Sequence, residues 1–387
     1  MKIAQICPFF YPVKGGLEES VFQISKELIN KGHEVEVLTS DSSRDGKIKE
    51  SFEIIDGIKV FRFNTIFSLG DFGKVWPGFI IELIRKKYDI IHVHNYRHVH
   101  TILSALICKI KNIPCVLTTH SPFHPPTIRK SLSRFFILFY DLFLGRVFDR
   151  FFSRIILITN SEIKYFKHVN KNKIIVIPNG ISDTTFRKVN EKAIRLVIRR
   201  FNLRKNDKII LFVGRIHPTK GLYFLLQSFY ELSKTIKGLK LIIVGPIQDQ
   251  KYYKELIQFI NLNKLSVIFT GYITEDEKIA LYSLSSVLVL PSIYEPFGIV
   301  ILEAFARGKP VIAVESDGPE YLIKNGENGF LVKYGDIKSL ASCIELLLKD
   351  KKLYKRISLN NKKKAVQFTW SKIVNKLIKV YEEILEK

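Results

Sequence analysis

The sequence predicts an α/β protein with two Rossmann-like, doubly wound domains. Short apolar runs rich in β-branched residues alternate with amphipathic stretches along the whole chain, which is the pattern of parallel strands joined by helices. Most of these runs are almost continuously hydrophobic, as expected for strands buried on both faces of a sheet. The length of 387 residues also fits two or three domains better than one.

The predicted strands fall into two series, one in each half of the chain. The first series is Lys2–Cys7, Glu34–Thr39, Asp89–His94, Cys115–Thr119, Arg154–Thr159 and Lys173–Ile177. The second series is Lys208–Val213, Lys240–Val244, Ser266–Phe269, Ser286–Leu290, Pro310–Val314 and Gly329–Val332. Helical patterns lie between them, for example at Leu17–Asn30, Gly221–Thr235, Tyr252–Asn261 and Ile337–Leu348.

The domain boundary is expected in the charged stretch near Asp183–Arg200. We therefore assign residues 1–185 to a first domain and residues 186–369 to a second, followed by a helical segment over residues 370–387. Open α/β sheets bind ligands at the carboxyl ends of their strands. Two such domains are thus expected to face a central cleft that encloses a ligand.

The composition excludes several classes of protein. A hydrophobic fraction of 47% and a charged fraction of 25% are ordinary for a soluble protein and argue against disorder, collagen-like sequence or a polytopic membrane protein. The longest apolar run, at Phe135–Leu144, is shorter than the about 20 residues that span a bilayer. The start of the chain lacks the pattern of a secretory signal, and the four cysteines form no C-x-x-C pair. We therefore expect a cytoplasmic protein.

The chain is strongly basic. Lys and Arg total 61 against 37 for Asp and Glu, which gives a formal charge of +24. This excess favours nucleic acid, anionic lipid or phosphorylated small molecules as partners, although solvated lysines on helix faces explain it equally well. One stretch, Thr127–Arg154, interleaves cations with many Phe, Leu and Ile residues. Its cations are Arg129, Lys130, Arg134, Arg146, Arg150 and Arg154. Such a helix packs its apolar face in the core or lies on an anionic membrane.

A glycine pair, Gly15-Gly16, follows the first predicted strand and precedes the first predicted helix. Glycines at this place let the backbone approach a ligand, and the start of a helix offers free N–H groups to an anion. A plain turn explains the pair equally well. The sequence contains neither G-x-G-x-x-G nor G-x-x-x-x-G-K-[ST], so the usual signatures of dinucleotide oxidoreductases and P-loop NTPases are missing.

The segment VGRIHPTKG, from Val213 to Gly221, ends the first strand of the second series. Arg215 and Lys220 are expected to project from the loop that follows, at the carboxyl end of the sheet. A guanidinium fork and an ammonium group together suit a diphosphate. We therefore interpret this loop as a site for a phosphorylated ligand.

The segment PSIYEPFGIVILEAFARGKP, from Pro291 to Pro310, places two glutamates eight residues apart. The helix start at Phe297-Gly298-Ile299 can bind phosphate oxygens through backbone N–H groups. Glu303, about one turn inside this helix, can accept hydrogen bonds from ribose hydroxyls. Glu295, ahead of the helix, can hold the hydroxyls of a sugar beyond the phosphates.

Four histidines form the pattern H-x-H…H-x-H at His92, His94, His98 and His100. The first two share one strand face, and the spacing could hold zinc. No nearby carboxylate or cysteine completes such a set, so we favour His94 as a residue that lines the ligand site. The sequence also has no Asp-x-Asp pair, and we expect no metal.

Together, the glycine pair, VGRIHPTKG, EPFGIVILE and IPNGISD resemble the retaining glycosyltransferases of the GT-B fold, and among them the large GT4-like group (glycosyltransferase group 1). The later segments SDGPEYL (Ser316–Leu322) and ENGFLV (Glu327–Val332) also fit the pattern of this group. One departure is PNGISD, because the group usually has Asp directly after Asn-Gly-Val. A role for Asp183 is therefore not carried over.

The resemblance implies roles for specific residues. It implies that Glu295 and Glu303 grip the donor sugar and the ribose, while Arg215 and Lys220 stabilise the leaving nucleoside diphosphate. It also implies that His120 lies near the donor sugar. The remaining residues implied in donor binding are Gly15, Gly16, Asn179, Gly214, Phe297, Gly298 and Ile299.

The sequence is thus interpreted as a retaining, metal-independent glycosyltransferase that moves a hexosyl unit from a UDP- or GDP-linked sugar to a glycan or a polyprenyl- or lipid-linked acceptor. The first domain with helix 370–387 is expected to bind the acceptor, and the second the nucleotide sugar. No cofactor and no nucleic-acid partner are expected, and peripheral contact with the inner face of an anionic membrane is possible. The alternatives are a nucleotide-sugar epimerase of the same fold and a basic nucleic-acid-binding module.

Overall fold

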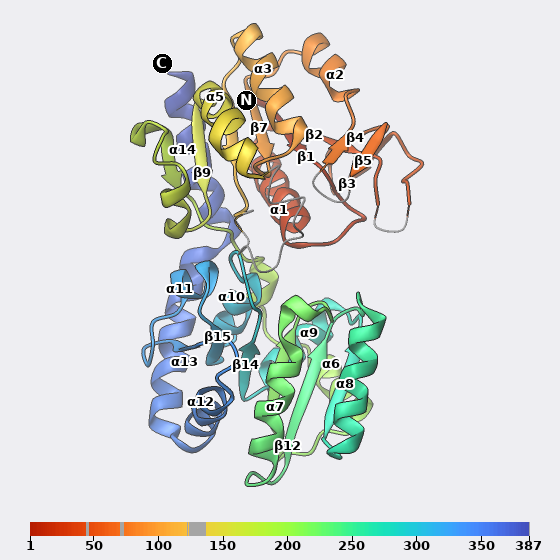
Figure 1. The fold of residues 1–387 in the computed structure, drawn as a ribbon, viewed down its shortest axis with the longest axis vertical. Helices are drawn as coiled ribbons and strands as arrows, with labels where there is room; N and C mark the ends of the chain where they lie inside the picture. Colours follow the sequence, from red (N-terminus) through yellow and green to blue (C-terminus); the bar gives the residue numbers. More distant parts are fainter. Residues whose placement is uncertain (44–45, 70–72, 122, 124–136, 387) are drawn as a thin grey trace. The chain divides into compact units, whose positions relative to one another are not determined.

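The computed structural model describes residues 1–43, 46–69, 73–121, 123 and 137–386. It divides into two compact units (Figure 1). The first unit comprises residues 1–180 together with the C-terminal segment that begins at Trp370, and the second comprises Ile181–Thr369. Each unit is built around its own mainly or fully parallel sheet, as the sequence predicts.

Within its described residues, the first unit has one sheet of eight strands. These are β1 (Lys2–Cys7), β2 (Glu34–Ser40), β3 (Phe52–Ile55), β4 (Ile58–Phe63), β7 (Ile90–His94), β8 (Cys115–Thr118), β9 (Arg154–Leu157) and β10 (Ile174–Val176). The order across the sheet is β10-β9-β8-β7-β1-β2-β4-β3, and the pairing is parallel except between β3 and β4. After β1 the chain continues to β2, toward one edge of the sheet, whereas after β7 it continues to β8, toward the other edge.

The sequence prediction missed the strands between residues 52 and 75. These are β3, β4 and a separate hairpin of β5 (Phe67–Leu69) and β6 (Gly73–Val75). Along β4 buried and more exposed residues alternate, because this part of the sheet is covered less completely than its centre. A search for continuous apolar runs therefore passes over it.

Alternate residues of the first sheet enter two different cores. Ile90 packs with α1 (Gly16–Asn30) and α14 (Trp370–Leu385) on one face. Its neighbour Ile91 packs with α2 (Phe79–Arg85) and α3 (Val99–Lys111) on the other. Both faces are covered by helices, which explains why the central strands are almost purely hydrophobic.

The C-terminal helix α14 is part of the core of the first unit. Trp370 and Tyr381 are 3% and 0% exposed, and the hydroxyl of Tyr381 lies 2.6 Å from Nδ1 of His92 on β7. A Cβ atom added to Gly180 would lie 2.7 Å from the ring of Trp370. The glycine of the PNG segment therefore leaves room for the first turn of α14.

The second unit, every residue of which is described, has a fully parallel sheet of six strands. They are β11 (Lys208–Val213), β12 (Leu239–Val244), β13 (Val267–Gly271), β14 (Val287–Leu290), β15 (Val311–Val314) and β16 (Gly329–Val332). Its helices are α6 (Glu191–Arg200), α7 (Leu222–Ser233), α8 (Gln250–Leu262), α9 (Glu275–Leu284), α10 (Ile299–Ala306), α11 (Asp317–Leu322), α12 (Ile337–Lys349) and α13 (Lys351–Ala365).

The strands of this second sheet run in the order β13-β12-β11-β14-β15-β16, which is the doubly wound order of Rossmann folds. The chain leaves β11 and β14 toward opposite sides of the sheet. Such a switch point opens a crevice outside the carboxyl ends of the two strands, where α/β proteins bind ligands. The VGRIHPTKG and PSIYEPFG segments follow these two strands.

The basic and aromatic stretch of the first unit is mainly helical in its described part up to residue 151. Its cations Arg129, Lys130 and Arg134 lie outside the described residues. From residue 137 the chain forms helical turns that include Tyr140–Leu144 and α5 (Gly145–Phe148) and end before β9. None of the helices in the described parts of the chain is long and apolar enough to cross a bilayer.

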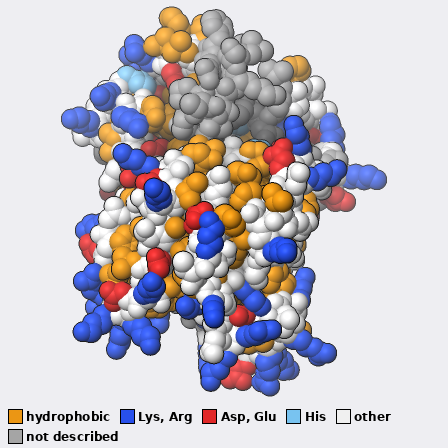
Figure 2. Space-filling model, turned by 60° about the horizontal axis from the view of Figure 1, so that its bottom comes forward, with side chains coloured by type: hydrophobic (Ala, Val, Ile, Leu, Met, Phe, Trp, Pro, Cys, Tyr) orange, Lys and Arg blue, Asp and Glu red, His pale blue; other side chains and the backbone are white. Residues whose placement is uncertain are grey.

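The positive charge of the protein is distributed widely. On the face shown in Figure 2, Lys and Arg side chains are scattered among hydrophobic and neutral ones and do not form a single basic stripe among the coloured residues. A basic patch or stripe is the usual electrostatic footprint of proteins that bind a nucleic-acid backbone.

Replacing Trp370 with Ala is predicted to lower the free energy of unfolding by about 3–5 kcal/mol, because a buried aromatic side chain would leave a cavity between α14 and the sheet. Urea unfolding followed by circular dichroism measures this change. The matched control is Lys376→Ala, on the exposed side of the same helix. Equal stability of the two variants would contradict the packing role of Trp370.

Candidate functional site

The loop after β11 is shaped by a glycine that no other residue can replace easily. Gly221 has φ +67°, and an added Cβ atom would lie 2.0 Å from the carbonyl oxygen of Pro291. The two loops at the switch point therefore touch through their backbones. The N–H of Ile293 donates to the carbonyl of Thr219 at 3.0 Å, which ties them together next to Lys220.

This contact brings Lys220 and Glu295 together. Nζ of Lys220 lies 2.7 Å from Oε2 of Glu295, and the two side chains are only 17% and 15% exposed. A partly buried ion pair of this geometry holds both groups in fixed positions. The ammonium group has three N–H donors, so it can bind an anion while it remains paired.

A second loop contact orients Glu295. The N–H of Gly318 donates to the carbonyl of Glu295 at 3.1 Å, and a Cβ atom on Gly318 would lie 2.3 Å from the carbonyl oxygen of Phe297. Gly298 has φ +85° and precedes α10. The EPFG turn is therefore clamped on both sides, and its backbone leads directly into the N-terminus of a helix that can stabilise an anion.

Arg215 lies in the same loop as Lys220. One guanidinium nitrogen of Arg215 donates to Oε1 of Gln248 at 2.8 Å. Burial, together with the charges of Arg215 and Lys220, lowers the pKa of His217 between them. The loop thus carries two cationic side chains, those of Arg215 and Lys220. Gly214 before it lies against Gly245, where an added Cβ would be 2.2 Å from the Gly214 carbonyl oxygen.

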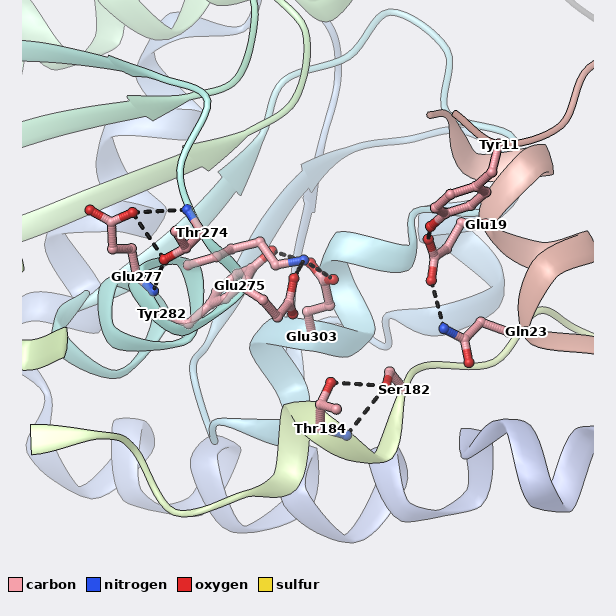
Figure 3. Close-up of polar contacts among 11 residues, drawn as sticks. Tyr11, Glu19, Gln23, Ser182, Thr184, Thr274, Glu275, Glu277, Tyr282 and Glu303 are labelled. Atoms are coloured by element: carbon pink, nitrogen blue, oxygen red, sulfur yellow. Dashed lines mark hydrogen bonds and ion pairs between the residues drawn. The ribbon is translucent and has the colours of Figure 1, made fainter. Parts of the chain in front are cut away.

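Glu303, in the second turn of α10, is held by two residues of α9 (Figure 3). Nζ of Lys278 lies 2.8 Å from Oε1 of Glu303, and the hydroxyl of Tyr282 donates to Oε2 at 2.7 Å. The side chain of Glu303 is 13% exposed, so it is accessible although both oxygens have a partner.

In the first unit, the glycine pair lies at the start of α1. Gly15 precedes the helix in extended conformation, and a Cβ atom on Gly16 would meet nothing within 4 Å. Two carboxylates, of Glu18 and Glu19, already lie in the first turn, where they complement the helix dipole. Glu19 accepts hydrogen bonds from Tyr11 and Gln23 (Figure 3). Anion binding by Gly15 and Gly16 thus depends on backbone N–H groups alone and stays a prediction.

Asn179 lies after β10 and is 8% exposed. The hydroxyl of Ser20 on α1 lies 3.3 Å from Oδ1 of Asn179. The side chain therefore connects the PNG segment to the helix that follows the glycine pair.

His120 follows β8 in a conformation that is unusual for residues with a side chain. His120 and Ser121 have φ values of 54° and 49°, and two consecutive residues in the left-handed region cost free energy that the surrounding structure must supply. Such strain often accompanies functional sites.

A chain of hydrogen bonds fixes the proton on the His120 ring. Nε2 of His94 lies 2.6 Å from Oε1 of Gln5, and Nδ1 of His94 lies 2.9 Å from Nε2 of His120. Because the amide oxygen only accepts, His94 carries its proton on Nε2 and accepts at Nδ1. His120 must then donate from Nε2, so the lone pair of its ring is on Nδ1. Burial lowers the pKa of His120 to about 3, so the ring is neutral.

The other histidines of the pattern have separate partners. His92 contacts Tyr381 and Thr118, while Nε2 of His100 donates to the carbonyl of His94 at 2.9 Å. Within the part of the chain that the structure describes, no group of three or more His, Cys, Asp or Glu residues is arranged to hold a metal ion. These imidazoles are buried and hydrogen-bonded within the core around the central strands β7 and β8.

Comparison with known proteins assigns the family. The model of Glycosyltransferase Family 4 matches residues 14–185, and that of Glycosyl transferases group 1 matches residues 194–364. The chain belongs to the glycosyltransferase group 1 (GT4) family. The resemblance seen in the sequence is confirmed, and the protein is a GT4 glycosyltransferase that uses a nucleotide-sugar donor.

Its relatives cover nearly all or most of the chain. An uncharacterized glycosyltransferase of Methanocaldococcus jannaschii, MJ1178, is 30% identical over 97% of this chain and 96% of its own length. The UDP-Gal:alpha-D-GlcNAc-diphosphoundecaprenol alpha-1,3-galactosyltransferase of Escherichia coli is 30% identical over 79% and 78%. Among solved structures, Anabaena Alr3699/HepE in complex with UDP and glucose has a TM-score of 0.78 at 22% identity, over 99% and 100%. This last likeness shows a shared GT-B fold.

The predicted site residues of the glycosyltransferase fall into two groups. Those of the second unit gather at the β11–β14 switch point; they are Gly214, Arg215, Lys220, Glu295, Phe297, Gly298, Ile299 and Glu303. Those of the first unit are Gly15, Gly16, His120 and Asn179, on loops that follow β1, β8 and β10.

Sequence reasoning missed the partners of these residues. Gln248, Lys278 and Tyr282 contact Arg215 and Glu303 from other elements. No motif includes them, because they lie 21 to 33 residues from the groups they contact. Helix α9, which carries Lys278 and Tyr282, was not among the helices that the sequence analysis named.

The stability of the protein is predicted to fall as the pH decreases from 6.5 to 5. Burial lowers the pKa values of His92 and His98 to about 3 and of His100 to about 4. In this range the unfolded chain binds protons that the folded chain does not. Each of these histidines therefore lowers the free energy of unfolding by up to about 1.4 kcal/mol for each pH unit of acidification. Most carboxylates stay ionised there.

Melting temperatures measured across this range test the pH dependence. His100→Gln is expected to reduce the slope of melting temperature against pH, because this variant takes up one proton fewer on unfolding. A melting temperature that stays constant from pH 6.5 to 5 would contradict the prediction.

Proposed function

We propose that this glycosyltransferase transfers a hexosyl unit, with retention of configuration and without a metal ion, from a UDP- or GDP-linked sugar to a glycan or lipid-linked acceptor. The observation that supports it most is the Lys220–Glu295 pair, in which a cation and a carboxylate lie 2.7 Å apart at the switch point. The E. coli relative and the Anabaena neighbour carry UDP-Gal and UDP in their names, which favours UDP as the donor nucleotide.

The second unit is proposed to bind the nucleotide sugar. Arg215, Lys220 and the N-terminal backbone of α10, at Phe297, Gly298 and Ile299, would contact the diphosphate. Glu295 would accept hydrogen bonds from the sugar hydroxyls, and Glu303 from the ribose. This assignment follows the order of a donor molecule, in which the diphosphate separates the sugar from the nucleoside.

The chemistry depends on stabilising the leaving group. The bond between C1 of the sugar and the diphosphate oxygen breaks first, and positive charge develops at C1 as in other glycosyl transfers. The electron pair remains on the diphosphate, where Arg215, Lys220 and the helix N-terminus stabilise it. The acceptor oxygen then forms the new bond to C1 on the same face, and its proton passes to the departing phosphate oxygen.

In our proposal, Arg215, Lys220 and the N-terminus of α10 together stabilise the leaving diphosphate, so this step needs no metal ion. The sequence has no Asp-x-Asp pair to hold one, whereas the loop after β11 supplies Arg215 and Lys220. A guanidinium group and an ammonium group that are already oriented need little rearrangement as charge develops.

The first unit is proposed to bind the acceptor. His120, whose neutral ring has its Nδ1 lone pair free of the His94 contact, would contact the donor sugar or the incoming hydroxyl. Gly15, Gly16 and Asn179 remain predicted donor contacts. The E. coli relative acts on a diphosphoundecaprenol-linked sugar according to its name, which supports a lipid-linked acceptor for this chain.

A lipid-linked acceptor would bring the enzyme to the inner face of an anionic membrane. Exposed apolar side chains lie on the helical turns after residue 137, with exposed fractions of 57%, 45%, 59% and 53% for Leu138, Phe139, Phe143 and Val147. Arg146 and Arg150 lie on the same segment. Apolar side chains next to cations are typical of helices that bind at the lipid surface.

The proposed activity predicts that Lys220→Ala and Glu303→Ala reduce kcat by about 100- to 1,000-fold, because each removes a charged contact to the donor. A thermal-shift panel of UDP, GDP, ADP and their sugars identifies the donor, and product analysis with and without acceptor measures transfer and its stereochemistry. Lys251→Ala, on the exposed side of α8, is the control. Turnover near that of the control in either variant would refute the assigned roles.

The proposed membrane contact predicts that the protein floats with vesicles that contain phosphatidylglycerol and much less with neutral ones. Phe143→Ser is expected to reduce flotation, whereas Tyr272→Ser, which removes a 74% exposed ring from the second unit, is not. The contact would be refuted if the protein failed to float at low salt, or if both variants floated equally.

A further inference from the structure

The carboxylate of Glu303 is held by a pair of donors on one helix. Lys278 and Tyr282 are four residues apart on α9, so their side chains leave the same face of the helix. They contact different oxygens of Glu303, at 2.8 and 2.7 Å. Lys278 also pairs with Glu275 at 3.0 Å. Figure 3 shows this group beside the start of α9.

Helix α9 is itself firmly anchored at its start. The side chain of Thr274 caps the helix and accepts from the N–H of Glu277, whose carboxylate accepts from the N–H of Thr274 in return. Glu277 also pairs with Arg200 of α6 at 2.8 Å. The two donors to Glu303 thus project from a fixed element, and Tyr282 is completely buried.

Both donors keep their protons at neutral pH. Burial opposes the charge of Lys278, but the carboxylates of Glu303 and Glu275 outweigh it and raise the pKa of the ammonium group. Burial and the charge of Glu303 raise the pKa of the Tyr282 hydroxyl. Each oxygen of Glu303 therefore accepts one hydrogen bond within the protein and retains a second lone pair.

We propose that Lys278 and Tyr282 are positioning residues that orient the Glu303 carboxylate toward the ribose hydroxyls of the donor and so make the enzyme selective for ribonucleotides. This inference rests on the proposed function, in which Glu303 binds the ribose. Two lone pairs on a fixed carboxylate match the two neighbouring hydroxyls of a ribose. A carboxylate already fixed in this way loses less conformational freedom on binding.

The experiment compares two ligands by calorimetry: the nucleoside diphosphate (UDP or GDP) that the wild type binds more tightly, and its 2′,3′-dideoxy analogue. The wild type is expected to prefer the ribonucleotide by about 10- to 100-fold, as for hydrogen bonds to a charged group. Tyr282→Phe and Lys278→Met are expected to weaken ribonucleotide binding by about 5- to 10-fold and to leave binding of the analogue unchanged. Lys278→Arg is expected to recover most of the preference.

Thr274→Ala is the matched control, because it removes the cap of α9 without touching Glu303. It is expected to lower the melting temperature while the preference stays at the wild-type ratio. Equal weakening of both ligands in Tyr282→Phe and Lys278→Met would reveal a merely structural role and overturn the inference, as would an unchanged ratio in these variants or a wild type that binds both ligands equally. If the wild type bound neither nucleotide, the proposed function itself would fail, and the inference with it.

Discussion

The close approach of two backbones at the β11–β14 switch point is the constraint on which the candidate site depends. Gly221 lets the loop after β11 pack directly against Pro291, since any side chain would overlap the carbonyl oxygen 2.0 Å away. This contact sets the distance between Lys220 and Glu295. It also ties the loop after β11 to the turn that leads into α10, through the bond from the N–H of Ile293 to the carbonyl of Thr219.

The sequence predicted the central strands because they are buried on both faces. Runs such as those of β11 and β12 contain almost only apolar residues, and this pattern needs no knowledge of their neighbours. Strands β3 to β6 could not be found in the same way. In β3 and β4, more buried residues alternate with more exposed ones, and the sheet edge that creates this environment exists only in the folded protein.

The same distinction applies to the site. Two short segments contain the predicted catalytic and binding side chains of the second unit, namely Arg215 and Lys220 in one and Glu295 and Glu303 in the other. Each segment follows a strand and leads into a helix, so its position could be predicted from the sequence. The residues that orient them were not predictable. Tyr282 reaches Glu303 across 21 residues because α9 lies beside α10, and such a contact between helices leaves no local pattern in the sequence.

The return of the chain to its first unit has a consequence for how such enzymes can be recombined. The polypeptide passes between the units twice, after Gly180 and before Trp370, and the last helix completes a core that the first 180 residues leave open. A single crossover between two related genes would therefore split this core between parents. To exchange the second unit intact, both ends of residues 181–369 must be joined to the first unit of the other parent. The second unit is therefore equivalent to a domain inserted into the first.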